Sequence, residues 1–207
     1  MIDASSYHYG EPAAGDFRHH DYLIPAVLSI LKDVRPKRIL DLGCGNGLAA
    51  HVLATHGYRI IGVDPSEEGI NWARAHYPDI EVHQGSASDD LLGRFGTFPV
   101  VISLEVVEHI YDPRTYARTL FNLVEPGGLA IVSTPYNGYL KILAVALFNK
   151  FDAHYNPLWD HGHIKFWSVS TMTRLLEEAG FGAIEFRRVG RVPPLAKSMI
   201  AIARKPK

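Results

Sequence analysis

The fold is decided by a stretch that reads Ile39-Leu40-Asp41-Leu42-Gly43-Cys44-Gly45-Asn46-Gly47-Leu48. An apolar run leads into its glycines, and a helical pattern over 48–54 follows them. This order predicts a tight turn between the carboxyl end of a parallel strand and the N-terminus of a helix, where doubly wound sheets bind ligands. The spacing is Gly-x-Gly-x-Gly, whereas a dinucleotide pyrophosphate requires Gly-x-Gly-x-x-Gly. A turn that serves only strand–helix packing would have the same sequence pattern.

The two strands predicted after this turn end in polar residues. The β-rich run 59–64 ends in Asp64, and an acid at this position binds ribose hydroxyls. The next strand ends before Ser86, whose hydroxyl can accept a hydrogen bond or simply form a Gly-Ser turn. The amides of the glycine turn and the dipole of the helix that follows suit a carboxylate.

Hydrophobic periodicity predicts alternating strands and helices in one domain. Five strand–helix units precede two consecutive strands, which we expect to pair antiparallel. Ser66 and Ser170 are expected as helix N-caps, and Gly180 as a helix end. The expected strands are 37–42, 59–64, 80–84, 98–104, 129–134, 181–189 and 198–203, and the expected helices are 20–34, 46–57, 66–76, 113–124, 138–150 and 170–179.

A second informative segment, Glu105-Val106-Val107-Glu108-His109, follows the fourth strand. In a helical turn its two carboxylates and imidazole would share one face, and such a face can hold a cation. Two histidines downstream, His161 and His163, could complete that site. Without a metal, His109 would act as a general base or would simply pack.

Two further segments flank this core. The segment 138–150 is apolar nearly all round but too short to span a bilayer. It would cover a lipophilic acceptor, lie at a membrane surface, or serve as a buried helix or dimer contact. Residues 1–35 are expected to form an N-terminal arm or lid helix before a domain over 36–207, with Arg18 against a cofactor carboxylate or, equally, exposed on a surface helix.

Composition narrows the function classes. The chain has 207 residues, of which 47% are hydrophobic, and a net charge of −1, so bulk nucleic-acid binding is not expected. Cys44 is the only cysteine, and the first residues lack the features of a signal peptide, which together predict a cytoplasmic protein. Cys44 is either a reactive thiol at a helix N-terminus or, in the simpler interpretation, a small residue that fills the turn.

Asp41-Leu42 with the glycine turn, Asp64 and Gly127-Gly128 together resemble the class I S-adenosylmethionine-dependent methyltransferases over the chain after Pro36. The resemblance implies an α/β, Rossmann-like doubly wound sheet of seven strands in the order 3-2-1-4-5-7-6, with strand 7 antiparallel. Ser86 stands where the family usually carries an acid for the adenine amine. Cofactor contacts are expected from Asp41, Gly43, Cys44, Gly45, Gly47, Asp64, Pro65, Ser86, Ala87, Leu104 and Arg18.

Within that class, the Glu-x-x-Glu-His segment with a later histidine resembles the ubiquinone-biosynthesis O-methyltransferases and the small-RNA 2′-O-methyltransferases. In both families a divalent metal positions the accepting hydroxyl. The resemblance assigns Glu105, Glu108 and His109 as ligands of Mg²⁺, Mn²⁺ or Zn²⁺, and either His161 or His163, here His163, as a further ligand.

We therefore expect an enzyme that transfers a methyl group from S-adenosylmethionine to a small hydroxylated acceptor, with His109 as the catalytic residue. RNA 2′-O-methylation ranks lower because the chain has no basic stripe. A nicotinamide-dependent oxidoreductase lacks its glycine spacing here. A non-catalytic protein that binds S-adenosylmethionine is the remaining alternative.

Overall fold

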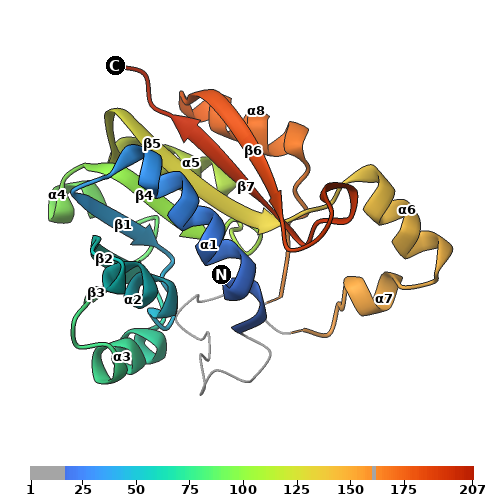
Figure 1. Cartoon of the computed structure of the whole chain (residues 1–207), viewed down its shortest axis with the longest axis horizontal. Coiled ribbons are helices and arrows are strands. Elements are labelled where there is room, and N and C mark those ends of the chain that lie inside the picture. Colours follow the sequence, from blue (N-terminus) through green and yellow to red (C-terminus); the bar gives the residue numbers. More distant parts are fainter. Residues whose placement is uncertain (1–16, 160–161) are drawn as a thin grey trace.

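A seven-stranded sheet forms the centre of the computed structural model, which describes residues 17–159 and 162–207, with side chains from His20 onward (Figure 1). The strand order is β3-β2-β1-β4-β5-β7-β6, and β7 is antiparallel to both of its neighbours. The expected topology is therefore confirmed. The strands are β1 (Arg38–Leu42), β2 (Arg59–Asp64), β3 (Glu81–Gln84), β4 (Phe98–Leu104), β5 (Val124–Pro135), β6 (Gly182–Val189) and β7 (Ser198–Arg204).

Helices cover both faces of the sheet, so the central strands are buried on both sides and consist of nearly continuous apolar runs. One core cluster lies under α1, α2 and α3, and the other under α4, α5 and α8. The helices are α1 (Phe17–Val34), α2 (Leu48–Thr55), α3 (Glu67–His76), α4 (Leu91–Phe95), α5 (Pro113–Leu123), α6 (Tyr139–Leu147), α7 (Phe151–His154) and α8 (Val169–Ala179), with a short 3₁₀ turn at Pro193–Leu195.

Helix α1 belongs to the core rather than to a separate lid over most of its length. Leu23, Val27 and Leu31 recur at helical spacing and are fully buried against the sheet. The expected arm over 1–35 therefore packs on the domain from Leu23 onward. The side chain of Arg18 and residues 1–16 lie outside the described residues, so a lid formed by them stays a prediction.

The expected helix over 138–150 ends early, as α6 at Leu147, and a second short helix, α7, follows it; both project from the end of β5 (Figure 1). Neither helix has a buried residue. The two helices are separated at Asn149, whose φ of 50° cannot continue a right-handed helix. In the described part of the chain, no helix is long and apolar enough to cross a membrane.

Strand β5 begins at Val124, five residues earlier than expected. Val124 pairs with Phe98, and a bulge then shifts the register before Val100 pairs with Leu129. Gly127 has a φ of 80°, and a Cβ on Gly128 would lie 2.7 Å from the carbonyl oxygen of Pro99. These two glycines, which lie between the expected helix over 113–124 and the expected strand over 129–134, are therefore part of a bulged strand.

The helix caps confirm two expectations and correct a third. Ser66 accepts a hydrogen bond from the amide of Gly69, and Gly180 ends α8 with a φ of 107°. Ser170 is not a cap, because α8 begins at Val169 and its N-cap is Ser168. Ser168 and Thr171 form a reciprocal capping box, and the threonine replaces the usual acid or amide.

Replacing Ser168 with alanine should lower the free energy of unfolding by about 1 kcal/mol, because the amide of Thr171 at the start of α8 loses its acceptor. The matched variant Ser170→Ala should change it by less than about 0.5 kcal/mol, since Ser170 is exposed on the helix. Urea denaturation of both variants measures the difference. A larger loss for Ser170→Ala would contradict the observed cap.

Candidate functional site

The glycine turn lies between β1 and α2, as predicted, at the carboxyl edge of the parallel strands. Gly43, Gly45 and Gly47 have φ values of 85°, 55° and 78°, a region that favours glycine. The amides of Gly43 and Cys44 donate to the carbonyl oxygen of Val63 in β2. These two amides therefore hold the turn against the neighbouring strand, which corrects the expectation that the turn amides as a group face a ligand.

Cys44 has a structural position in this turn. Its side chain is buried and lies so close to Gly62 that a Cβ on that glycine would be 2.8 Å from Sγ. Burial also raises the pKa of the Cys44 thiol well above its usual value. The alternative of a reactive thiol is therefore wrong, and Cys44 fills the turn.

Two buried carboxylates lie beside the turn. Asp64 accepts hydrogen bonds from the amides of Gly45 (2.8 Å) and Ser66 (2.9 Å), one on each oxygen. Burial raises its pKa to about 6 despite these bonds. Asp41 lies next to it in β1, and burial together with the charge of Asp64 raises the pKa of Asp41 to about 7. One Asp41 oxygen, Oδ2, has no hydrogen-bond partner among the described residues, so this pair can accept donors or positive charge from a ligand.

The other expected cofactor residues border the same edge. Pro65 directly follows β2, and Leu104 is the last residue of β4; both are half-buried. Ser86 and Ala87 follow β3, where the Ser86 amide donates to Asp89 at 2.8 Å. Asp89, which the sequence did not indicate as a site residue, is an acid three residues after the position at which the family usually carries one.

Affinity for S-adenosylmethionine should fall as the pH drops from 8 to 5, by about two- to tenfold, because a protonated Asp64 loses an acceptor for the ribose. Affinity falls toward low pH because the pKa of Asp64 is near 6. The ionised carboxylate, which accepts the hydrogen bond, is present above that pH and is lost below it. Calorimetry at each pH measures this profile. Asp64→Asn should bind more weakly at pH 8 and give a flatter profile, and an equal pH profile in both proteins would contradict the assignment.

The segment after β4 is a loop with a turn at 107–108, not the helical turn that we expected. Glu105 has a φ of 55°, a backbone conformation that residues other than glycine rarely adopt. Its carboxylate accepts hydrogen bonds from the hydroxyls of Ser133 (2.7 Å) and Ser198 (3.3 Å), in β5 and β7. Two strands of the sheet therefore hold the Glu105 carboxylate, and it is not among the ligand atoms that group together with those of Glu108 and His109.

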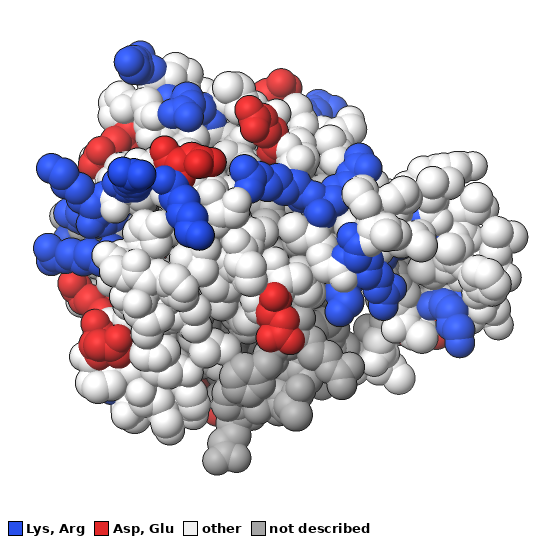
Figure 2. Space-filling view, in the orientation of Figure 1, with Lys and Arg blue, Asp and Glu red and all other residues white. Residues whose placement is uncertain are grey.

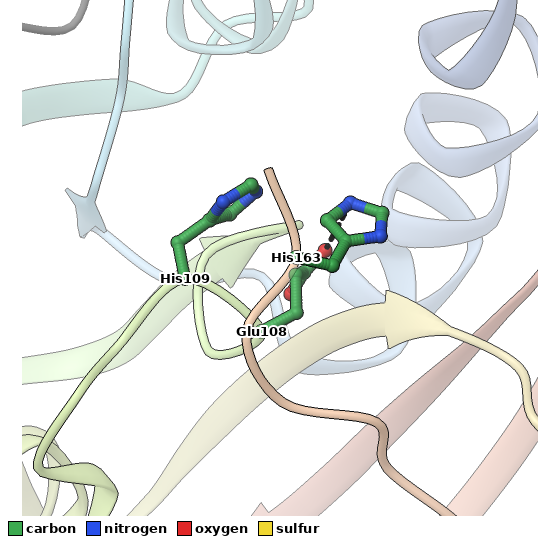
Figure 3. A group of neighbouring side chains, drawn as sticks. All are labelled: Glu108, His109 and His163. Carbon is green, nitrogen blue, oxygen red and sulfur yellow. Dashed lines mark ion pairs between the residues drawn. The ribbon is translucent and has the colours of Figure 1, made fainter. Parts of the chain in front are cut away.

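Glu108, His109 and His163 do come together (Figure 3). One ligand atom from each lies within 4.8 Å of the others, and Nε2 of His163 is 3.9 Å from Oε1 of Glu108. The two imidazole rings are 5.0 Å apart between centroids. His161, the other downstream candidate, lies outside the described residues.

Backbone contacts hold the two halves of this cluster together. The carbonyl oxygen of Glu108 accepts the amides of Ile164 (2.9 Å) and Lys165 (3.0 Å). The indole of Trp167 donates to the carbonyl oxygen of Val107 at 3.2 Å. The segment that carries His163 is thus fixed against the loop after β4, although more than fifty residues separate the two in sequence.

The cluster has the donors that a divalent cation needs. Glu108 is 1% exposed, and neither of its oxygens accepts a well-formed hydrogen bond from the described residues. Burial and the charge of Glu105 raise its pKa, and the nearby Thr134 hydroxyl only partly opposes this. Burial, with the charges of His109 and His154, lowers the pKa of His163 to about 4, so its imidazole is neutral at pH 7. A buried carboxylate beside a neutral imidazole lacks a counter-charge that a cation would supply.

Residues that sequence reasoning missed connect this cluster to the rest of the sheet. The Tyr22 hydroxyl in α1 lies 3.1 Å from the hydroxyl of Ser198, which in turn bonds Glu105. Burial raises the pKa of Glu105 to about 7, and Ser133, Ser198 and the charge of Lys141 oppose the rise. No motif links these four segments, since only the folded sheet brings them together.

Comparisons with known proteins agree with this geometry. A family model described as a methyltransferase domain matches residues 17–185. The chain belongs to this family. The class I resemblance is therefore confirmed, and S-adenosylmethionine is the cofactor of the family.

Two curated relatives are named ubiquinone biosynthesis O-methyltransferase. The protein from Aromatoleum aromaticum is 30% identical over 72% of this chain and 65% of its own length. The one from a Caulobacter species is 40% identical over 59% of this chain and 48% of its own length. The chain thus spans about half to two thirds of the relatives that it matches.

Solved structures show the same fold. A protein from Pyrococcus horikoshii superposes with a TM-score of 0.73 at 19% identity, and the match covers 96% of this chain and 95% of that one. The methyltransferase domain of a bacterial Hen1 protein gives a TM-score of 0.67 at 22% identity, over 89% of this chain and 97% of that one. At these identities the likeness concerns the fold alone.

Proposed function

We propose that this protein transfers the methyl group of S-adenosylmethionine to a hydroxyl oxygen of a small acceptor. The observation that carries the proposal is the position of the Glu108–His109–His163 cluster at the end of β4, beside the glycine turn at the end of β1. The two strands are hydrogen-bonded neighbours, and the Ser103 hydroxyl also donates to the carbonyl oxygen of Leu42 at 2.6 Å. Groups that bind the cofactor and groups that act on the acceptor thus share one edge of the sheet.

The chain has residues that fit the cofactor. Asp41 and Asp64 place acceptor oxygens at the turn, one of them without a partner, where a cationic ligand with ribose hydroxyls would bind. The bound cofactor supplies an electrophilic methyl group on a sulfonium. The protein must then align the acceptor oxygen with that methyl group and exclude water, because in-line displacement depends mainly on orientation.

The acceptor hydroxyl must also lose its proton. His109 can take it as a general base, since its imidazole is only half-buried and its Nδ1 is 3.3 Å from the Gly162 carbonyl oxygen. A divalent cation bound at this place would lower the pKa of the hydroxyl. Glu108, His109 and His163 are the residues that would hold it. Glu105 would have to leave Ser133 and Ser198 to join them, so we propose three protein ligands rather than four.

Methyl transfer to catechol, followed with labelled S-adenosylmethionine, tests the function. Transfer to the phenol oxygen would support the proposal. Transfer only to the 3′-terminal 2′-hydroxyl of a short RNA would favour the RNA alternative. Cofactor binding without transfer to a broad panel of phenols, catechols and RNA would leave a non-catalytic binding protein.

Glu108→Gln tests the metal cluster. The substitution keeps the size of the side chain but removes a charge, so turnover should fall at least about tenfold while S-adenosylmethionine affinity changes by less than about twofold. Activity of the unmodified protein should fall in excess chelator and return with Mg²⁺ or Mn²⁺. Glu81→Gln is a matched control because Glu81 is an exposed acid at the far edge of the sheet. Full activity in chelator, with no metal found by elemental analysis, would leave His109 as a direct base.

The α6–α7 lobe, residues 139–154, is proposed to contact a lipophilic acceptor or a bilayer surface. It exposes large apolar side chains, among them Leu147 (73%) and Phe148 (72%), and forms the largely uncharged projection in Figure 2. Exposed apolar surface of this extent favours a partner. A dimer contact through the same lobe stays a prediction.

Leu143→Glu with Leu147→Glu should abolish any co-sedimentation with liposomes, because charged side chains do not enter the acyl region. Leu92→Glu is the matched control, since Leu92 is 43% exposed in α4 and Leu143 is 40% exposed. Circular dichroism checks that the variants fold. If the double variant changes neither lipid binding nor acceptor affinity, the lobe has only a structural role.

A further inference from the structure

A cavity of about 470 Å³ lies where the α6–α7 lobe meets the body of the protein. Its walls combine apolar and cationic side chains, and none of the lining residues is an acid. Figure 2 shows Lys and Arg side chains gathered where the projecting lobe joins the body. The apolar walls are Pro135, Ala144, Val145, Phe148 and Leu195, and the polar ones are Lys141, Lys150, His154, Arg191 and Lys197.

The cations of this cavity, Lys141, Lys150, Arg191 and Lys197, take part in no salt bridge of the described residues. Lys141 instead donates to the carbonyl oxygen of Lys197 at 3.4 Å, and the Lys197 ammonium lies 5.2 Å from the centre of the Tyr22 ring. Lys141 is half-buried, and burial with the neighbouring charge of Arg191 lowers its pKa to about 8. Like charges held together in a partly buried cavity create a strong field for an anion.

The cavity borders the candidate active site. Glu105, which follows β4, is close enough for its charge to act on Lys141, and Ser198, which bonds Glu105, directly follows Lys197. On the other side, the charge of His154 acts on His163 of the metal cluster. Two lining residues, Lys141 and His154, are therefore electrostatic neighbours of the groups proposed to act on the acceptor.

We propose that this cavity binds the acidic group of an amphipathic acceptor, a carboxylate or phosphate joined to an apolar body. Lys141 and Arg191 would hold the anion, and the apolar side chains of α6 would cover the body. The acceptor hydroxyl would then lie toward Glu108 and His109. This last point rests on the proposed methyl transfer, whereas anion binding in the cavity does not.

Two fluorescent probes separate charge from apolar contact. 8-Anilinonaphthalene-1-sulfonate carries an anionic group on an apolar body, and N-phenyl-1-naphthylamine is its neutral analogue. The double variant Lys141→Met with Arg191→Met should weaken sulfonate binding at least about tenfold and change binding of the neutral probe by less than about twofold. Arg174→Met, an exposed cation on α8 that pairs with Glu178, should leave both unchanged. Equal loss of both probes, or no loss of the sulfonate, would overturn the proposal.

Competition against the sulfonate probe identifies the source of the anion. Displacement by 3,4-dihydroxybenzoate, with weaker displacement by catechol, would support an acidic acceptor. Displacement only by short-chain phosphatidylglycerol would show a lipid headgroup site and overturn it. These experiments measure binding and not methyl transfer, so they can refute the cavity proposal without refuting the proposed function. Charge-dependent probe binding with no methyl transfer would refute only the function, and methyl transfer to catechol with unchanged probe binding would refute only the cavity.

Discussion

The parallel pairing of β1 with β2 and β4 is the constraint on which the site depends. It brings the carboxyl ends of three strands to one edge, so that the glycine turn, Asp64 and the loop with Glu108 and His109 become neighbours. Asp64 then ties the turn to β2 by accepting the amide of Gly45. The same edge holds two buried carboxylates whose pKa values burial raises, so a positively charged ligand would be favourable there.

The features that could be predicted are those formed by residues close together in the sequence. The strands, the crossover helices and the antiparallel ending follow from local periodicity and from the class I resemblance, and β2 and β4 have the predicted bounds. Local patterns failed where a tertiary contact competes with them. Glu105 leaves the expected helical face because two serines from β5 and β7 bind its carboxylate, and β5 absorbs a Gly-Gly pair in a bulge. Ser168 caps α8, and Thr171 completes a capping box with it. The spacing of apolar residues alone did not favour Ser168 over Ser170 as the cap.

The cavity under α6 could not have been predicted from the sequence. Its cations come from three segments, around Lys141, Lys150 and Arg191, which carry no shared motif and meet only after β5 and β7 pair. The same pairing brings Ser198 to Glu105, so antiparallel strands near the C-terminus form the side of the site on which we propose that the acceptor binds. The residues proposed to bind the cofactor lie in contiguous turns that the sequence shows, whereas those proposed to bind the acceptor come together only through distant contacts.

We propose that a cation held by Glu108, His109 and His163 lies beside the cofactor methyl group. The most direct test of this proposal is carbon-13 magnetic resonance of S-adenosylmethionine labelled at the methyl carbon and bound to the protein, with paramagnetic Mn²⁺ added. We expect Mn²⁺ to broaden the methyl signal strongly in the unmodified protein. In Glu108→Gln, at equal cofactor occupancy, this broadening should disappear. An unbroadened methyl signal at saturating Mn²⁺, or equal broadening in Glu108→Gln, would contradict the proposal.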